Sequence, residues 1–126
     1  MKRRSVLGLG AVLAGLAHFA KAQDAARVQP SSYRVVLEND RVRVLDYNGR
    51  PGMGVCGTGI HHHPAHLTVR LTPATVKITQ NGRTVLVDNR LGDVFWSEAV
   101  THETENVGGA NVRSLIIELK DHVRGH

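Results

Sequence analysis

Four histidines fall within six residues of this chain, at positions 61, 62, 63 and 66. Side chains alternate between the two faces of a strand, so His61 and His63 would point the same way and His62 the opposite way. Imidazole nitrogens are common ligands of divalent metal ions, and a His-x-His pair on a strand can place two of them on one ion. The motif is short, and a polar surface tract would also fit it. We take His61 and His63 as candidate metal ligands.

A second segment carries a related pattern further along the chain. It opens on Gly92 and contains His102, three further residues, and then Asn106. A His-x-His pair followed by a glycine-led segment that ends in this way resembles the two sequence motifs of the cupin superfamily. His61 and His63 match the first motif, and Gly92, His102 and Asn106 match the second. The resemblance implies an all-β fold, a single-domain cupin-type antiparallel β-barrel or jelly roll, with His61, His63 and His102 as metal ligands.

The chain departs from the cupin pattern where a glutamate usually follows the paired histidines. That position falls on Leu67, or on Thr68 if one residue is inserted, and neither side chain is a good ligand. His66 is a candidate fourth ligand. Simple alternation would turn His66 away from the two paired histidines, but Pro64 often marks a bulge that re-aims the residues after it. A role of His66 in the pocket, without ligation, is the competing interpretation.

Three histidines without a carboxylate define the expected chemistry. Neutral imidazoles suit Zn, Cu, Fe and Ni. The sequence leaves the identity of the divalent metal ion unknown, with Fe, Zn, Cu, Ni or Mn as candidates. Three protein ligands leave coordination positions open, as in reactive sites, and the uncompensated ion favours anionic ligands. Cupins with three-histidine sites include dioxygenases, which the resemblance makes plausible here. Glu98 is the first candidate for a catalytic acid or base because it replaces a proline of the family pattern, whereas Glu103 and Glu105 are more simply read as solvated carboxylates.

Two functions remain open from the sequence. One is a metal-dependent enzyme, dioxygenase-like or lyase-like, that acts on a small anionic molecule. The other is a non-catalytic protein that binds a metal or a small ligand. Because a fold hosts many functions, the fold alone does not separate them. A cavity of about 300 Å³ or more with the histidines at its floor would favour the enzyme.

The chain beyond residue 22 reads as a series of short strands. Residues with alternating polar and apolar character are separated by turn residues, which is typical of half-buried strands. Asn81-Gly82 favours a tight hairpin turn between 76–80 and 84–87. Gly92-Asp93 marks a second turn. The other expected strands are 34–37, 41–47, 67–71, 94–96 and 112–119.

The first 22 residues resemble an export signal. A basic Lys2-Arg3-Arg4 start precedes an apolar run over 6–19, and Ala20-Lys21-Ala22 predicts cleavage before Gln23. Two arginines followed by Ser5 and apolar residues fit a twin-arginine signal, although an ordinary secretory signal remains the alternative. The apolar run is too short for a stable membrane anchor. We therefore expect a signal peptide over 1–22, a cupin domain over 23–126, and a periplasmic or secreted protein.

Charge and cysteine content limit the kinds of binding partner and the disulfide bonds that we expect. The net charge is +5, but four of the 16 basic residues lie in the predicted signal, so the rest of the chain is nearly neutral. Nucleic-acid binding is therefore not expected. The single cysteine, Cys56, excludes an internal disulfide and is more simply read as buried than as reactive. The resemblance to cupins adds the expectation of a small-molecule ligand and of a homodimer.

Overall fold

The computed structural model describes residues 23–52 and 59–121, so the predicted signal and Cys56 lie outside the described residues. One short helix, α2 (Ala25–Val28), precedes the strands, and no helix in the described ranges is long and apolar enough to cross a membrane. The strands are β1 (Tyr33–Glu38), β2 (Val42–Gly49), β3 (Ile60–His63), β4 (His66–Arg70), β5 (Ala74–Gln80), β6 (Arg83–Asn89), β7 (Val94–Ser97), β8 (Val100–Asn106) and β9 (Val112–Leu119).

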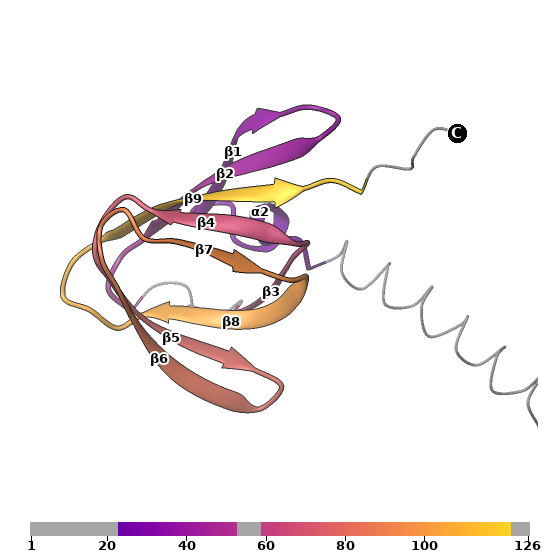
Figure 1. Ribbon diagram of the computed structural model, residues 1–126. Coiled ribbons are helices and arrows are strands. Elements are labelled where there is room, and N and C mark those ends of the chain that lie inside the picture. Colours follow the sequence, from indigo (N-terminus) through magenta and orange to yellow (C-terminus); the bar gives the residue numbers. More distant parts are fainter. Residues whose placement is uncertain (1–22, 53–58, 122–126) are drawn as a thin grey trace, which may run out of the picture.

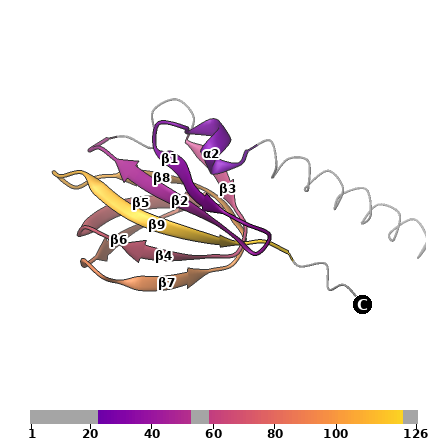
Figure 2. The same cartoon turned by 90° about the horizontal axis from the view of Figure 1, so that it is seen from above.

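The strands form two antiparallel sheets that face each other (Figure 1). A five-stranded sheet has the order β1-β2-β9-β4-β7, and a four-stranded sheet has the order β3-β8-β5-β6. Figure 2 shows the same layers from above, with α2 beside β3 and the start of β1. The all-β, jelly-roll prediction is confirmed.

The hairpin predicted at Asn81-Gly82 is also confirmed. β5 and β6 pair from Ala74↔Asn89 to Gln80↔Arg83, which leaves two residues in the turn. Both have positive φ, 52° at Asn81 and 73° at Gly82, as the favoured two-residue hairpin turn requires.

The inner face of the five-stranded sheet combines apolar and charged residues. On β2, Leu45 and Tyr47 are buried in the core, and alternation places Arg43 on the same face. On β9 the buried Ile116 shares its face with the buried Glu118. Two strands therefore direct a charged side chain inward at the same end of the sheet.

A corner in the chain separates the histidines into two groups. β3 belongs to the four-stranded sheet and β4 to the five-stranded sheet, so the chain changes sheet at Pro64 and Ala65. The face on which His66 lies therefore cannot be found by counting alternate residues from His61 and His63, because the two strands belong to different sheets. His66 is consequently buried, together with Thr68 and Arg70, on the inner face of β4.

Candidate metal centre

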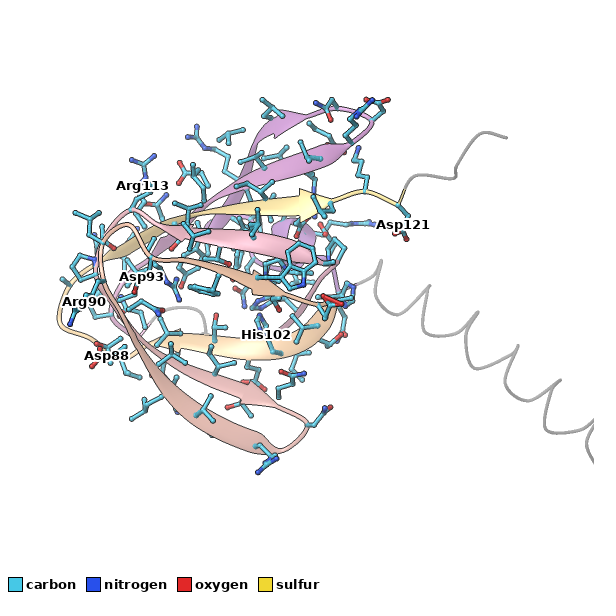
Figure 3. All side chains as sticks on the ribbon, in the orientation of Figure 1. Asp88, Arg90, Asp93, His102, Arg113 and Asp121 are labelled. Atoms are coloured by element: carbon cyan, nitrogen blue, oxygen red, sulfur yellow. The ribbon has the colours of Figure 1, made fainter. Side chains whose placement is uncertain are left out.

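Strand pairing brings three histidines together. β3 pairs with β8 so that His61 lies directly opposite His102, and His63 lies two residues further along the same face of β3. One ring nitrogen from each of the three lies within 4.8 Å of the others. Figure 3 shows His102 between the two sheets. Since zinc–nitrogen bonds are about 2.0–2.1 Å long, the cluster could hold one metal ion after a small closure of the rings.

Hydrogen bonds fix which nitrogen two of these rings present. Nδ1 of His61 donates to the Gly59 carbonyl oxygen at 3.0 Å, and Nδ1 of His63 donates to a Glu118 carboxylate oxygen at 2.7 Å. Each neutral ring is then left with an unprotonated Nε2, the form that binds metals.

Burial keeps the cluster neutral. It lowers the pKa of His61 to about 4, and it also lowers the pKa of His63 and of His102 well below the ordinary histidine value. The neighbouring imidazoles lower the pKa of His102 further, since a second positive charge nearby would be repelled. The residues present therefore fit a divalent cation, because its ligands must be unprotonated at neutral pH.

A tyrosine lies against the same cluster. The Tyr33 hydroxyl is 3.2 Å from Nε2 of His61 and donates to it, and the Tyr33 ring contacts the rings of His61 and His63 at 5.2 and 5.3 Å between centroids. Burial raises the pKa of Tyr33 above its ordinary range, so the hydroxyl is a hydrogen-bond donor and a poor acid. A metal at Nε2 of His61 would displace this bond.

A buried network of ion pairs binds Nδ1 of His63, the ring nitrogen on the opposite side from Nε2. Glu118, 1% exposed, receives Nδ1 of His63 at 2.7 Å through one oxygen and Nε of Arg43 at 2.8 Å through the other. Arg43 also donates to both carboxylate oxygens of Asp24. Burial raises the pKa of Glu118, while the Arg43 charge opposes that rise. The arrangement is a carboxylate–histidine pair that would orient a ligand and add negative charge behind it.

His66 lies beside the three clustered histidines because the chain changes sheet at Pro64 and Ala65, and not through the bulge suggested from the sequence. Its ring is 4.9 Å from the His63 ring between centroids, and its Nδ1 donates to the Pro64 carbonyl oxygen at 2.7 Å. His66 is not part of the three-residue group with nitrogens within 4.8 Å of one another. Its position fits a residue of the pocket next to the metal site, and ligation by His66 remains a prediction.

Glu98, the predicted catalytic residue, is placed elsewhere. Its side chain is exposed and receives the indole N–H of Trp96. It is absent from the described residues that line the cavity next to the histidines. The geometry therefore gives no support to a catalytic role for Glu98, which lies in the short connection between β7 and β8.

The histidines border a cavity of about 470 Å³ between the two sheets. His63, His66 and His102 lie on its wall together with Arg70, and no Asp or Glu is found among the described lining residues. Much of the remaining wall is apolar or aromatic: Tyr33, Tyr47, Val76, Ile78, Val87, Phe95, Trp96, Val100 and Ile116. The volume is in the range of small-molecule sites.

Asn106 has a structural role at the far end of β8. Its Nδ2 donates to the carbonyl oxygens of Gly49 and Ala110, and its Oδ1 accepts from the Gly108 amide. Gly92 has φ 88° in the turn before β7. These two motif residues hold the turns around the site and do not enter it.

Comparisons agree with this architecture. The chain has the cupin fold, with a three-histidine cluster that could hold a metal. No protein-family model matches the sequence, and no curated protein matches it. A cupin domain from Bordetella pertussis Tohama I is similar to it, with a TM-score of 0.63 and 25% identity over 71% of this chain and 92% of that one.

Two further solved structures show the same fold. One is a cupin superfamily protein from Desulfitobacterium hafniense DCB-2, with a TM-score of 0.52, 20% identity, and coverage of 71% of this chain and 76% of that one. The other is described as a predicted oxalate decarboxylase from Thermotoga maritima, with a TM-score of 0.50, 21% identity, and coverage of 70% and 79%. At these identities the likeness concerns the fold alone.

Proposed function

We propose that this protein is a metal-dependent enzyme that acts on a small anionic molecule. The observation that carries the proposal is the position of the cluster of His61, His63 and His102. His63 and His102 lie on the wall of a cavity of about 470 Å³. A site that only stores a metal needs no such cavity, whereas a reaction on an organic molecule does.

His61, His63 and His102 would hold the ion through their unprotonated nitrogens. A bound divalent metal would supply Lewis-acid polarisation of a substrate oxygen or, if it is iron, reaction with oxygen. Glu118 orients His63 and places negative charge behind the ring. That carboxylate compensates in part for the glutamate missing from the first motif, without occupying a position on the ion.

Proton transfer in this cavity would fall to His66. The described lining residues include no carboxylate, and His66 is the lining histidine outside the three-residue cluster. The Tyr33 hydroxyl would donate a hydrogen bond to a substrate oxygen without losing its proton, since burial raises its pKa. Apolar residues on the rest of the wall exclude water and strengthen both interactions.

A non-catalytic metal or small-ligand carrier is the second candidate. It is favoured by one observation, the lack of a carboxylate base on the described part of the cavity wall. A carrier would bind the same anions and release them unchanged. The two functions differ in whether a bound molecule is converted.

A turnover assay separates these functions. The purified protein is loaded in parallel with Fe²⁺, Mn²⁺ and Zn²⁺ and incubated with oxaloacetate or 2,4-dioxopentanoate, which join a carboxylate to a chelating oxygen pair. Oxygen uptake and product masses are measured. The enzyme predicts a product that needs one of the metals and disappears in the His66→Ala variant. Saturable binding without conversion of either compound would favour the carrier.

We also propose export to the periplasm or medium. Residues just after the predicted cleavage site take part in the fold: the Gln23 carbonyl oxygen accepts the His62 amide at 2.7 Å, and Asp24 binds Arg43. Cleavage before Gln23 would leave these contacts intact. Mass spectrometry of the N-terminus in each cell fraction tests this proposal, and Arg3→Lys/Arg4→Lys retention in the cytoplasm would indicate the twin-arginine route.

We further propose that a second copy covers the outer face of the five-stranded sheet. The register aligns Leu37, Val44, Ile117, Leu67 and Trp96 in one row across all five strands. Four strand spacings make this row about 19 Å wide. Flanking rows add more apolar side chains: Val42 and Leu119 on one side, and Leu115, Val69 and Val94 on the other.

The size of this outer face favours a copy of the same chain as its partner. An apolar patch about 19 Å wide is comparable to the centre of an interface of about 800 Å² per partner. Asp46 lies opposite Leu115 in one flanking row and is paired within the chain with Arg34 and Arg113, and Lys120 is paired with Glu38. Two such faces can therefore meet about a two-fold axis without leaving an unpaired charge.

A further inference from the structure

Arg70 is a buried cation that makes no ion pair with the described residues, although the Asp93 charge acts on it from beyond ion-pair distance. The residue is 7% exposed on the inner face of β4. Its Nε donates to the Asn89 side-chain oxygen at 3.1 Å and its Nη1 to the Ser114 hydroxyl at 3.0 Å, and both acceptors are neutral. Within residues 23–52 and 59–121 no carboxylate lies within ion-pair distance of it. Burying a charge in this way is costly unless something compensates for it.

The contrast with Arg43 shows what Arg70 lacks. Arg43 is tied to two carboxylates, Asp24 and Glu118, which consume its donors. On Arg70, Nη2 has no hydrogen-bond partner among the described residues, although Phe95 covers the guanidinium at 5.2 Å from its ring centroid. A guanidinium whose orientation is fixed by two neutral acceptors still presents N–H groups to a ligand.

Arg70 and the histidines border the same cavity from different positions along β4. His66, Thr68 and Arg70 all face inward and line it. Arg70 lies four positions after His66, which is about 13 Å along an extended strand. The cavity therefore has a histidine end and a guanidinium end, and apolar side chains such as Val76 and Ile116 lie on its wall.

We infer that Arg70 binds the carboxylate of the cavity's ligand. The inference rests on the proposed function, since it names the substrate class of the same site. The ligand is a small organic acid with a carboxylate on the Arg70 guanidinium and an oxygen-bearing group at the end near His61, His63 and His102. The ligand's carboxylate would place a negative charge in direct contact with Arg70, which no described residue does, since Asp93 acts on it only from a longer distance.

The surroundings favour a carboxylate over a phosphate. Arginine offers a planar edge that matches two carboxylate oxygens. Arg70 is the one Arg or Lys among the described lining residues, so a phosphate dianion would leave one charge uncompensated against apolar walls. The apolar stretch between the two ends fits a short hydrocarbon body in the ligand.

The first test needs only the wild-type chain, stripped of metal by a chelator. Isothermal titration calorimetry compares hexanoate with hexanamide, its neutral analogue, and with inorganic phosphate. We expect hexanoate to bind at least tenfold more tightly than the other two. Equal affinity for hexanoate and hexanamide would overturn the inference. Tighter binding of phosphate than of hexanoate would also overturn it, because the group bound by Arg70 would then be a phosphate.

Variants then assign the effect to Arg70. Arg70→Met should lose the preference for hexanoate, and Arg70→Lys should keep part of it because the charge remains without the planar edge. Arg34→Met is the matched control, since Arg34 is exposed on β1. Circular dichroism and zinc affinity establish that each variant folds. If Arg70→Met does not fold, Arg70→Lys and the wild-type comparison decide, and an unchanged preference in Arg70→Lys would count against the guanidinium.

A length series separates this inference from the proposed metal site. Dicarboxylates from succinate to pimelate are titrated into zinc-loaded and metal-free protein. The account predicts one preferred length in the zinc-loaded protein, at least tenfold tighter than hexanoate, and no preferred length without zinc. Failure of zinc to bind would refute the metal site while the metal-free comparison still tests Arg70. A preferred length that survives in Arg70→Met would refute Arg70 as the second end.

Discussion

Glu118 accepts a hydrogen bond from Nδ1 of His63 at 2.7 Å, although the two residues are 55 positions apart in the chain. The carboxylate lies behind the imidazole, so the opposite ring nitrogen is left for a metal. Glu118 is held in turn by Arg43, and both residues point inward at one end of the five-stranded sheet. The protein thus has a carboxylate close to its histidine cluster without having one among the candidate ligands.

Replacement of Glu118 by glutamine should weaken metal binding. Glutamine removes the negative charge behind His63 and no longer requires Nδ1 to carry the proton. Loss of such a partner typically costs about 10–100-fold in metal affinity. Competition with a chelating dye measures the affinity for Zn²⁺. Glu105→Gln is the control, because Glu105 pairs with Lys77 outside the cavity, and equal affinities in the two variants would contradict the role of Glu118.

Replacement of Tyr33 by phenylalanine should strengthen metal binding. In the structure the Tyr33 hydroxyl donates to the ring nitrogen of His61 that a metal would need. A hydrogen bond of this kind stabilises the metal-free state by about 1 kcal/mol, so its removal should raise the affinity for Zn²⁺ about fivefold. Tyr47→Phe is the control, since Tyr47 lines the same cavity. A fall in affinity specific to Tyr33→Phe would show that the hydroxyl supports the bound ion.

Asp46 should contribute stability that depends on pH. Its carboxylate is bound by Arg113 and Arg34 on the outer face of β2, and the hydrogen bond from Arg113 is the first cause of its lowered pKa. A pKa that is lower in the folded than in the unfolded chain stabilises the fold above about pH 4, and this stabilisation is lost as the pH falls through the folded value.

Urea unfolding of Asp46→Asn tests this dependence. At pH 7 the variant should be less stable than wild type by roughly 1 kcal/mol. The difference should shrink below about pH 4, where the carboxylate is progressively protonated. Asp121→Asn, at an exposed position after β9, should show little change at either pH. A difference for Asp46→Asn that stays constant with pH would exclude the charged form as its cause.

The dimer should be sensitive to charge on the outer face of the five-stranded sheet. Val94 is 59% exposed on β7, within the apolar rows described above. Val94→Glu should weaken self-association at least about 100-fold, since two unpaired carboxylates would be buried. Leu86→Glu, at a 70% exposed position on β6 of the other sheet, should have no effect. Sedimentation equilibrium measures both, and a monomeric wild type would refute the dimer.

Most of the fold could be predicted from the sequence because the strands alternate and the turn residues are distinctive. The hairpin at Asn81-Gly82 and the last strand, 112–119, agree with the structure. β8 was not expected as a strand, because Thr, His and Glu mask its alternation. The motif resemblance implied that His61, His63 and His102 share one site, whereas the pairing of His61 opposite His102 could be seen only in the structure.

The parts of the site that sequence reasoning missed are long-range partners. Glu118 and Arg70 both lie on inward faces, and each could have been noticed as a charged residue in phase with buried neighbours. On β9, Glu118 has the same parity as Ser114 and Ile116. Parity alone does not reveal what a buried charge faces, because its partners come from other strands. Glu98 shows the opposite error. It is close in sequence to β8, which carries His102, but it is not among the described residues that line the cavity.

Metal content tests the central claim most directly. The protein is purified without a tag and its metals are measured by mass spectrometry, beside a His61→Ala/His63→Ala/His102→Ala variant and a His62→Ala control. His62 lies on the other face of β3 and bonds to Thr101. The account predicts close to one divalent ion per chain in wild type and in His62→Ala, and none in the triple variant. Absence of metal from wild type even after reconstitution, or equal metal in the triple variant, would contradict it.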